Sequence, residues 1–210
     1  MPLLLLCLAC HAFTKWEIDL QRLKSLFESF DTIQEISIYY GTFVGSSSSE
    51  KRTQKFEALG YRVLTKPVKI MQLPIDVSSI TKDSPDILKN FIAPELLKKF
   101  KVETVEYLNA RLAELNQLGI THLEKHKCNF DVEIGRDMLQ HEDSAEGFCL
   151  WSGDSDFADP LLHLLKKKKK VSVFATSRRV SAEMNELRQK GLFIYDIVKI
   201  REFIEQKKTG

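Results

Sequence analysis

The stretch Phe148-Cys149-Leu150-Trp151-Ser152-Gly153-Asp154-Ser155-Asp156-Phe157 decides the predicted fold. Its first five residues are largely apolar, which predicts a buried strand, and the strand runs directly into a glycine and two aspartates. The leucine-rich segment from Pro160 onward indicates that a helix follows. In open parallel α/β sheets, ligands bind just outside the carboxyl ends of the strands. We therefore expect Asp154 and Asp156 to lie at a ligand-binding edge of such a sheet.

Two carboxylates two residues apart repel each other, and keeping both ionised beside a dry strand is costly unless a cation neutralises them. Asp154 and Asp156 therefore predict a divalent-metal site; the alternative is a solvated Asp-rich turn. Asp131 begins a further predicted helix and can face the same edge, with a helix N-cap as its alternative role. Asp137 lies about 9 Å further along that helix, on another face, so it is either solvent-facing or held for a specific reason.

The rest of the chain alternates between strands and helices, which predicts right-handed βαβ units and a parallel sheet. Residues 71–102 break this rhythm, and Pro74, Pro85 and Pro94 indicate an insertion of turns and short helical pieces. The expected elements are helices at 18–30, 50–59, 103–118, 129–139, 157–165 and 180–189, a short final helix, and strands at 35–41, 61–65, 148–152, 171–175 and 193–195.

The composition is that of a globular protein, and 210 residues suffice for one domain with an insertion. The formal net charge of +2 is nearly neutral, so any nucleic-acid contact must come from local patches. Candidate patches are the lysine run Lys166 to Lys170, the pair Arg178-Arg179, and the segment Lys125 to Lys127. A lysine run is equally typical of a solvated loop.

The N-terminal segment carries two misleading patterns. Cys7, Cys10 and His11 have the spacing of a haem-attachment site, and the apolar run from Leu3 to Ala9 imitates the core of a signal peptide. No basic residue precedes the run, no Ala-x-Ala site follows it, and it is far shorter than the roughly 20 residues that span a bilayer. The cysteines form no disulfide framework. We therefore expect a cytoplasmic protein with no haem and no membrane segment; its oligomeric state stays open.

Several motifs together resemble the NYN domain of LabA-like proteins, which are nucleases of the PIN-like superfamily. The resemblance covers residues 14–70 and 125–205 and leaves the segment 71–124 without a counterpart. The motifs are Lys127-x-x-x-Asp131-Val132 with Asp137-Met138, then Leu150-x-Ser152-Gly153-Asp154-Ser155-Asp156-Phe157, then Val171-x-Val173-Phe174, and upstream Trp16-x-Ile18-Asp19, Tyr39-Tyr40-Gly41 and Leu59-Gly60-Tyr61-x-Val63-x-Thr65-Lys66-Pro67.

The resemblance implies a single NYN domain over residues 1–210, a Rossmann-like three-layer α/β/α sandwich with a mostly parallel sheet and a partly helical insertion at about 71–124. It implies a hydrolase in which Mg²⁺ or Mn²⁺, held by carboxylates, cleaves phosphodiester bonds of RNA, which we expect to be single-stranded. Hard cations of this kind prefer oxygen ligands. The expected site residues are Asp131, Asp154 and Asp156 as metal ligands, these with Asp137 as catalytic residues, Ser152 and Ser155 as orienting groups, and Lys127, Lys166, Lys167, Lys168, Arg178 and Arg179 as phosphate contacts.

One departure from the family pattern bears on activity. NYN domains begin with a strand that ends in an Asp, followed shortly by an Asn, whereas Pro2 to Cys10 contains no acid. This run supplies a central strand or replaces the helix after a lost strand, and a wrongly assigned start would also explain it. Three functions are therefore compared: a metal-dependent endoribonuclease, a catalytically weakened NYN module that binds RNA or a protein, and a nucleotide-sugar transferase anchored by Asp154 and Asp156.

Overall fold

The computed structural model describes residues 2–7, 16–30, 33 and 35–207. The chain divides into two compact units. The first, which we call the sheet unit, comprises Met1–Pro67 and Cys128–Gly210. The second, the inserted unit, comprises Val68–Lys127 and so extends slightly beyond the segment 71–124 at both ends. Among the described helices, none is both long and apolar enough to span a bilayer.

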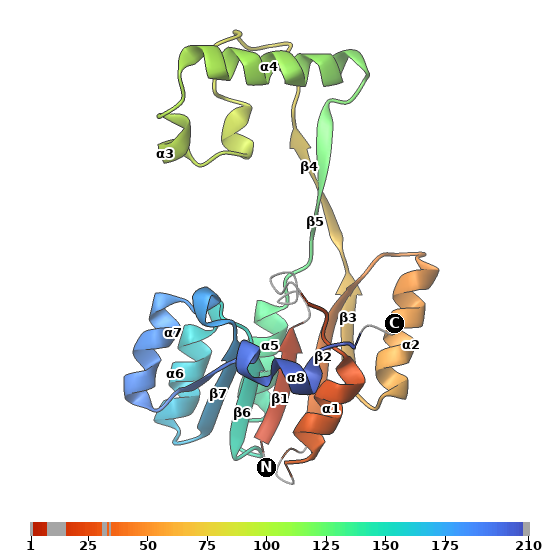
Figure 1. The fold of residues 1–210 in the computed structure, drawn as a ribbon, viewed down its shortest axis with the longest axis vertical. Coiled ribbons are helices and arrows are strands. Elements are labelled where there is room, and N and C mark those ends of the chain that lie inside the picture. The colour runs from red at the N-terminus through yellow and green to blue at the C-terminus, as the bar shows by residue number, and fades with distance from the viewer. Residues whose placement is uncertain (1, 8–15, 31–32, 34, 208–210) are drawn as a thin grey trace. The chain divides into compact units, whose positions relative to one another are not determined.

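The sheet unit is built on one six-stranded sheet in which all neighbouring strands are parallel (Figure 1). The strand order is β3-β2-β1-β6-β7-β8. From β1 the chain adds β2 and then β3 on one side. It then returns to the other side of β1 and adds β6, β7 and β8 in that order. The strands are β1 (Pro2–Cys7), β2 (Glu35–Thr42), β3 (Arg62–Pro67), β6 (Gly147–Trp151), β7 (Lys170–Ala175) and β8 (Phe193–Asp196).

The N-terminal apolar run forms the central strand β1. Leu3 pairs with Glu35 of β2 on one side and with Phe148 of β6 on the other. Of the two alternatives for this run, the structure thus shows the central strand. Cys10 and His11 of the haem-like spacing lie outside the described residues.

Helices cover both faces of the sheet, as the alternation along β6 demonstrates. Phe148 and Leu150 belong to a core cluster with residues of α5 and α6, whereas Trp151 belongs to a second cluster with residues of α1 and α8. Because successive side chains of a strand point to opposite faces, the two clusters are the two sides of one sheet. The predicted three-layer α/β/α fold is confirmed. The helices are α1 (Leu20–Glu28), α2 (Ser47–Ala58), α5 (Asp131–Gln140), α6 (Ala158–Lys166), α7 (Ala182–Glu186) and α8 (Arg201–Ile204).

Polar side chains define where several helices begin. Asp19, in the Trp16-x-Ile18-Asp19 motif, accepts hydrogen bonds from the backbone N–H groups of Gln21 and Arg22 at 2.9 and 3.1 Å. Ser46 accepts one from Ser49 at the start of α2. These N-caps satisfy backbone donors that have no partner within the helix.

The inserted unit combines a ribbon with a small helical core. Strands β4 (Lys69–Pro74) and β5 (His122–Lys127) pair antiparallel, and α3 (Pro94–Leu97) and α4 (Val102–Gln117) pack through Leu97 and Val105. The predicted helix at 103–118 is confirmed, but the sequence did not predict the two strands. Nearly all their residues are exposed, so they lack the apolar alternation that marks a half-buried strand.

A buried polar network ties α5 to the sheet. The Asp137 carboxylate, only 3 % exposed, accepts a 2.8 Å hydrogen bond from the Tyr39 hydroxyl and pairs with the Arg62 guanidinium at 3.1 Å. Burial, followed by the hydrogen bond to Asp137, raises the pKa of Tyr39 above its ordinary value. Asp137 therefore connects β2 and β3 to the helix, and its partners account for a buried carboxylate.

Replacing Asp137 with Ala should destabilise the protein by about 2 kcal/mol. Breaking a fully buried ion pair costs about 3–5 kcal/mol, and the loss here is smaller because Arg62 remains 38 % exposed. Urea unfolding measures the difference. Asp159→Ala, which removes an exposed acid of α6, is the control and should change the free energy of unfolding by less than about 0.5 kcal/mol. Equal stability of the two variants would contradict the structural role of Asp137.

Candidate metal centre

Three carboxylates from two separate segments meet at the carboxyl edge of the sheet. Asp131 is the first residue of α5, and Asp154 and Asp156 follow the end of β6. One ligand atom from each lies within 4.8 Å of the others. The sequence predicted this convergence, because α5 leads back into β6 and its N-terminus must share an edge with the strand ends.

Hydrogen bonds between near neighbours in the sequence orient Asp154 and Asp156. The buried Ser152 hydroxyl accepts the Asp154 backbone N–H at 3.2 Å, and Asp154 Oδ1 accepts the Asp156 backbone N–H at 3.2 Å. Asp154 thereby caps the 3₁₀ turn η3 (Ser155–Phe157). Ser152 thus contributes through the backbone, whereas Ser155 is exposed in the turn between the two acids.

Asp131 is not an N-cap, which corrects the alternative that the sequence left open. Phe130 occupies the cap position, and the Asp131 backbone N–H donates to Asn129 Oδ1 at 2.7 Å. The Asp131 carboxylate is therefore available for another role. Sequence reasoning missed Asn129, although an Asn two residues before a helix start is a recognisable local motif.

Gly153 allows another loop to pack directly against the site. A Cβ atom at this position would lie 2.3 Å from the backbone carbonyl oxygen of Arg179, a distance that atoms of this kind cannot adopt. The Ser181 backbone N–H also donates to the Gly153 carbonyl at 3.0 Å. Only glycine leaves room for this contact, which holds the loop after β7 beside Asp154.

The pKa of Asp131 is raised, and the main cause is partial burial. The negative charges of Asp154 and Asp156 raise it further, while the hydrogen bond with Asn129 acts in the opposite direction. Ionised carboxylates can only accept hydrogen bonds, so these three groups cannot satisfy one another. A cation would relieve this repulsion.

The spacing of the acids fits a hydrated divalent cation. Mg²⁺ binds oxygen at about 2.0–2.1 Å and usually retains several waters, so two ligands on opposite sides of the ion lie about 4.2 Å apart. The observed limit of 4.8 Å exceeds that value only slightly. Asp154 and Asp156 are exposed, so small side-chain rotations or a bridging water would close the difference.

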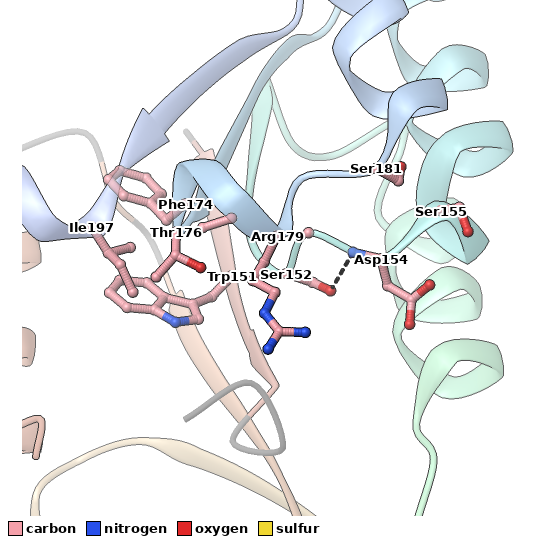
Figure 2. A pocket seen from close by; sticks show the side chains of 11 residues that line it. Trp151, Ser152, Asp154, Ser155, Phe174, Thr176, Arg179, Ser181 and Ile197 are labelled. Atoms are coloured by element: carbon pink, nitrogen blue, oxygen red, sulfur yellow. Dashed lines mark hydrogen bonds between the residues drawn. The ribbon is translucent and has the colours of Figure 1, made fainter. Parts of the chain in front are cut away.

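A pocket of about 320 Å³ opens next to Asp154 (Figure 2). Its walls include the side chains of Trp151, Thr176 and Arg179 as well as Asp154. A guanidinium and a carboxylate thus line the same pocket, one able to bind a phosphate and the other a cation. Arg178 is exposed in the same 3₁₀ turn, η4 (Ser177–Arg179), but is not part of the pocket wall.

Within the sheet unit, the predicted phosphate contacts Lys166 to Lys168 and the predicted catalytic residue Asp137 do not join this cluster. Lys166 to Lys168 connect α6 to the start of β7, where Lys170 pairs with Gly147, the first residue of β6. The run therefore lies at the amino edge of the sheet, roughly the length of β6, or about 17 Å, from the acids. The contact of the run with phosphates stays a prediction, at the edge of the sheet opposite the acids. Lys127 belongs to the inserted unit, and Asp137 is engaged in the Tyr39 and Arg62 network.

Comparisons with known proteins agree with this fold. A crystal structure of a protein of unknown function from Vibrio parahaemolyticus is similar, with a TM-score of 0.54 and 14 % identity over 98 % of this chain and 96 % of that one. At this identity the similarity concerns the fold alone. No curated protein sequence matches the chain. A family model described as NYN domain matches residues 89–195, from the inserted unit to β8 and across all three clustered acids. The chain therefore belongs to the NYN family of the PIN-like nuclease superfamily.

Proposed function

We propose that this protein is a divalent-cation-dependent ribonuclease whose ligands are Asp131, Asp154 and Asp156. The observation that carries the proposal is the meeting of these carboxylates within 4.8 Å at the reversal of winding between β1 and β6. Ligands of open α/β sheets bind at this kind of position. Bound Mg²⁺ or Mn²⁺ would activate a water and neutralise charge on the scissile phosphate.

The residues around the acids have separate roles in this proposal. Arg179 holds a phosphate of the RNA from the pocket beside Asp154, and Arg178 contacts the backbone further out. Ser152 fixes the direction of Asp154 through its backbone. Asp131 argues against a transferase with an Asp154-x-Asp156 diphosphate anchor, because it would then have no function in the cluster.

A second candidate function is an RNA-binding module with little or no catalytic power. The observation that favours it is the sequence of β1, the strand beside β6. Its last described residue is Cys7, and no acid occurs before Glu17. The family pattern places an Asp at the end of this strand, so the centre lacks one carboxylate. We therefore expect weak or no hydrolysis from the chain as it stands.

Metal binding can be tested without catalysis through thermal stability. Mn²⁺ should raise the Tm of the protein, and Asp131→Asn should abolish this increase. Without metal, Asp131→Asn should be more stable than the parent by at most about 1 kcal/mol, since Asp131 is only partly buried and its acidic neighbours are exposed. Asp159→Asn, an exposed acid outside the cluster, should behave like the parent in both conditions. A full Mn²⁺ response in Asp131→Asn would rule out this carboxylate as a ligand.

The pH dependence follows from the raised pKa of Asp131. At pH values above that pKa, the ionised Asp131 carboxylate destabilises the metal-free folded state. This destabilisation is lost as the pH falls through the raised pKa and the carboxylate takes up a proton. Only the ionised form binds metal, so the Mn²⁺-induced rise in Tm should shrink on acidification. The shrinkage should begin at a higher pH than an ordinary aspartate would give. An unchanged response down to pH 4 would contradict the assignment.

Catalysis is tested with purified protein, Mn²⁺ and single-stranded RNA. Any cleavage should disappear in Asp154→Asn, because Asn keeps the size of Asp but loses the charge that holds the cation. Cys7→Asp, which restores an acid at the end of β1, should increase cleavage at least tenfold if the missing carboxylate limits the rate. Cleavage that persists in Asp154→Asn would refute the proposed centre. RNA binding without cleavage in both the parent and Cys7→Asp would favour the binding module.

A further inference from the structure

The inserted unit contains a two-stranded antiparallel ribbon formed by β4 and β5 (Figure 1). Every residue of the two strands except Leu73 is exposed. Two-stranded sheets are marginally stable on their own in water. This ribbon also leaves Ile70, Met71 and Leu123 between 41 and 55 % exposed. The side chains of both strands are therefore accessible to a ligand.

The register of the strands gathers lysines on one face. Lys69 is paired with Lys127, and Met71 with Lys125. Alternate residues of a strand share a face, and directly paired residues of an antiparallel ribbon point the same way. Lys69, Lys125 and Lys127 therefore project from one face, which we call the lysine face. The opposite face carries Glu124 and His126, which lie 3.9 Å apart.

The lysine face has an electrostatic cost that a polyanion would remove. Like charges directly opposite each other destabilise an antiparallel pair, and Lys69 and Lys127 occupy such positions. Among the residues that the structure describes, no carboxylate lies within ion-pair distance of Lys69, Lys125 or Lys127. Glu124, the acid of β5, points to the other side. The positive charge of this face is thus left for a ligand.

We propose that the lysine face binds the phosphate backbone of single-stranded RNA. Lys125 and Lys127 are about 7 Å apart along their strand, and Lys69 is about 5 Å across from Lys127, so a flexible polyanion can contact all three. The aromatic rings of the ribbon, His122 and His126, belong to the opposite face, so the lysine face offers no ring on which a base would stack. Lysine contacts to phosphate read no sequence. Binding is therefore independent of base sequence. The choice of RNA rests on the proposed function.

The test is an RNA-binding titration in EDTA, where cleavage cannot occur. The probe is a labelled 20-nucleotide single-stranded RNA of mixed sequence, measured by fluorescence anisotropy at several salt concentrations. Replacing Lys69, Lys125 and Lys127 with Gln should weaken binding about tenfold or more in low salt. Each lost phosphate contact lowers the slope of log K against log salt by about 0.7 for single strands, so the slope should fall by about 2.

Two matched variants separate this surface from general charge. Gln at Lys51, Lys82 and Lys190, which are exposed and lie outside the ribbon, removes the same net charge and should leave the affinity within about twofold. Arg at the three ribbon positions should retain binding, because guanidinium groups also contact phosphate. Lys69→Gln alone should keep or raise the Tm, since it removes the repulsion with Lys127.

The outcomes distinguish this proposal from the proposed nuclease function. If the parent binds RNA and both Gln triple variants bind equally well, the lysine face is refuted while the nuclease proposal stands. If the parent binds no RNA in EDTA but its Tm responds to Mn²⁺, the RNA surface is refuted and the metal centre is not. Equal competition by poly-glutamate and by unlabelled RNA would also overturn the proposal, because an acidic protein would then be an equivalent partner.

Discussion

A sheet covered on both faces can present polar groups only at its edges, and this constraint determines where chemistry is possible in the sheet unit. The two core clusters enclose the strands, so burying a charge there requires partners, as Asp137 has in Tyr39 and Arg62. The carboxyl edge differs, because β6 ends and α5 begins there within reach of solvent. The three clustered acids are therefore a product of the topology as much as of local sequence.

The acidic centre is held by the backbone, because its own side chains repel one another. The Ser152 hydroxyl is hydrogen-bonded to the Asp154 backbone, and the Asn129 side chain to the first residue of α5. Gly153 leaves room for the loop after β7 to pack against it. None of these contacts requires a cation. The fold thus positions the three carboxylates next to one another without a cation, in spite of their mutual repulsion. This arrangement would reduce the reorganisation needed for a cation to bind. Arg179 arrives with the same loop, so the packing at Gly153 also places a positive group at the pocket.

How far the sequence predicts an element of this structure depends on whether the residues of that element are buried or exposed. The stretch 148–157 is apolar and then acidic, so its strand, its turn and its edge could all be predicted. The ribbon could not, because residues such as Lys69 and Lys127 are exposed and give no periodic signal. The position of the lysine run in the fold could not be predicted for another reason. Its composition indicates phosphate binding, but only the direction of α6 shows that it lies at the opposite edge from Asp154.

In the functions proposed above, RNA binding and bond cleavage would draw on different parts of this chain. The acids belong to the sheet unit, whereas Lys69, Lys125 and Lys127 belong to the inserted unit. A centre without an acid at the end of β1 would offer less negative charge to a cation, whereas the phosphate contacts proposed for the ribbon would not depend on that acid. Phosphate contacts supply most of non-specific affinity, so such a chain can keep its affinity for RNA while its hydrolysis weakens. The absence of an acid near Cys7 is therefore compatible with the proposed RNA binding.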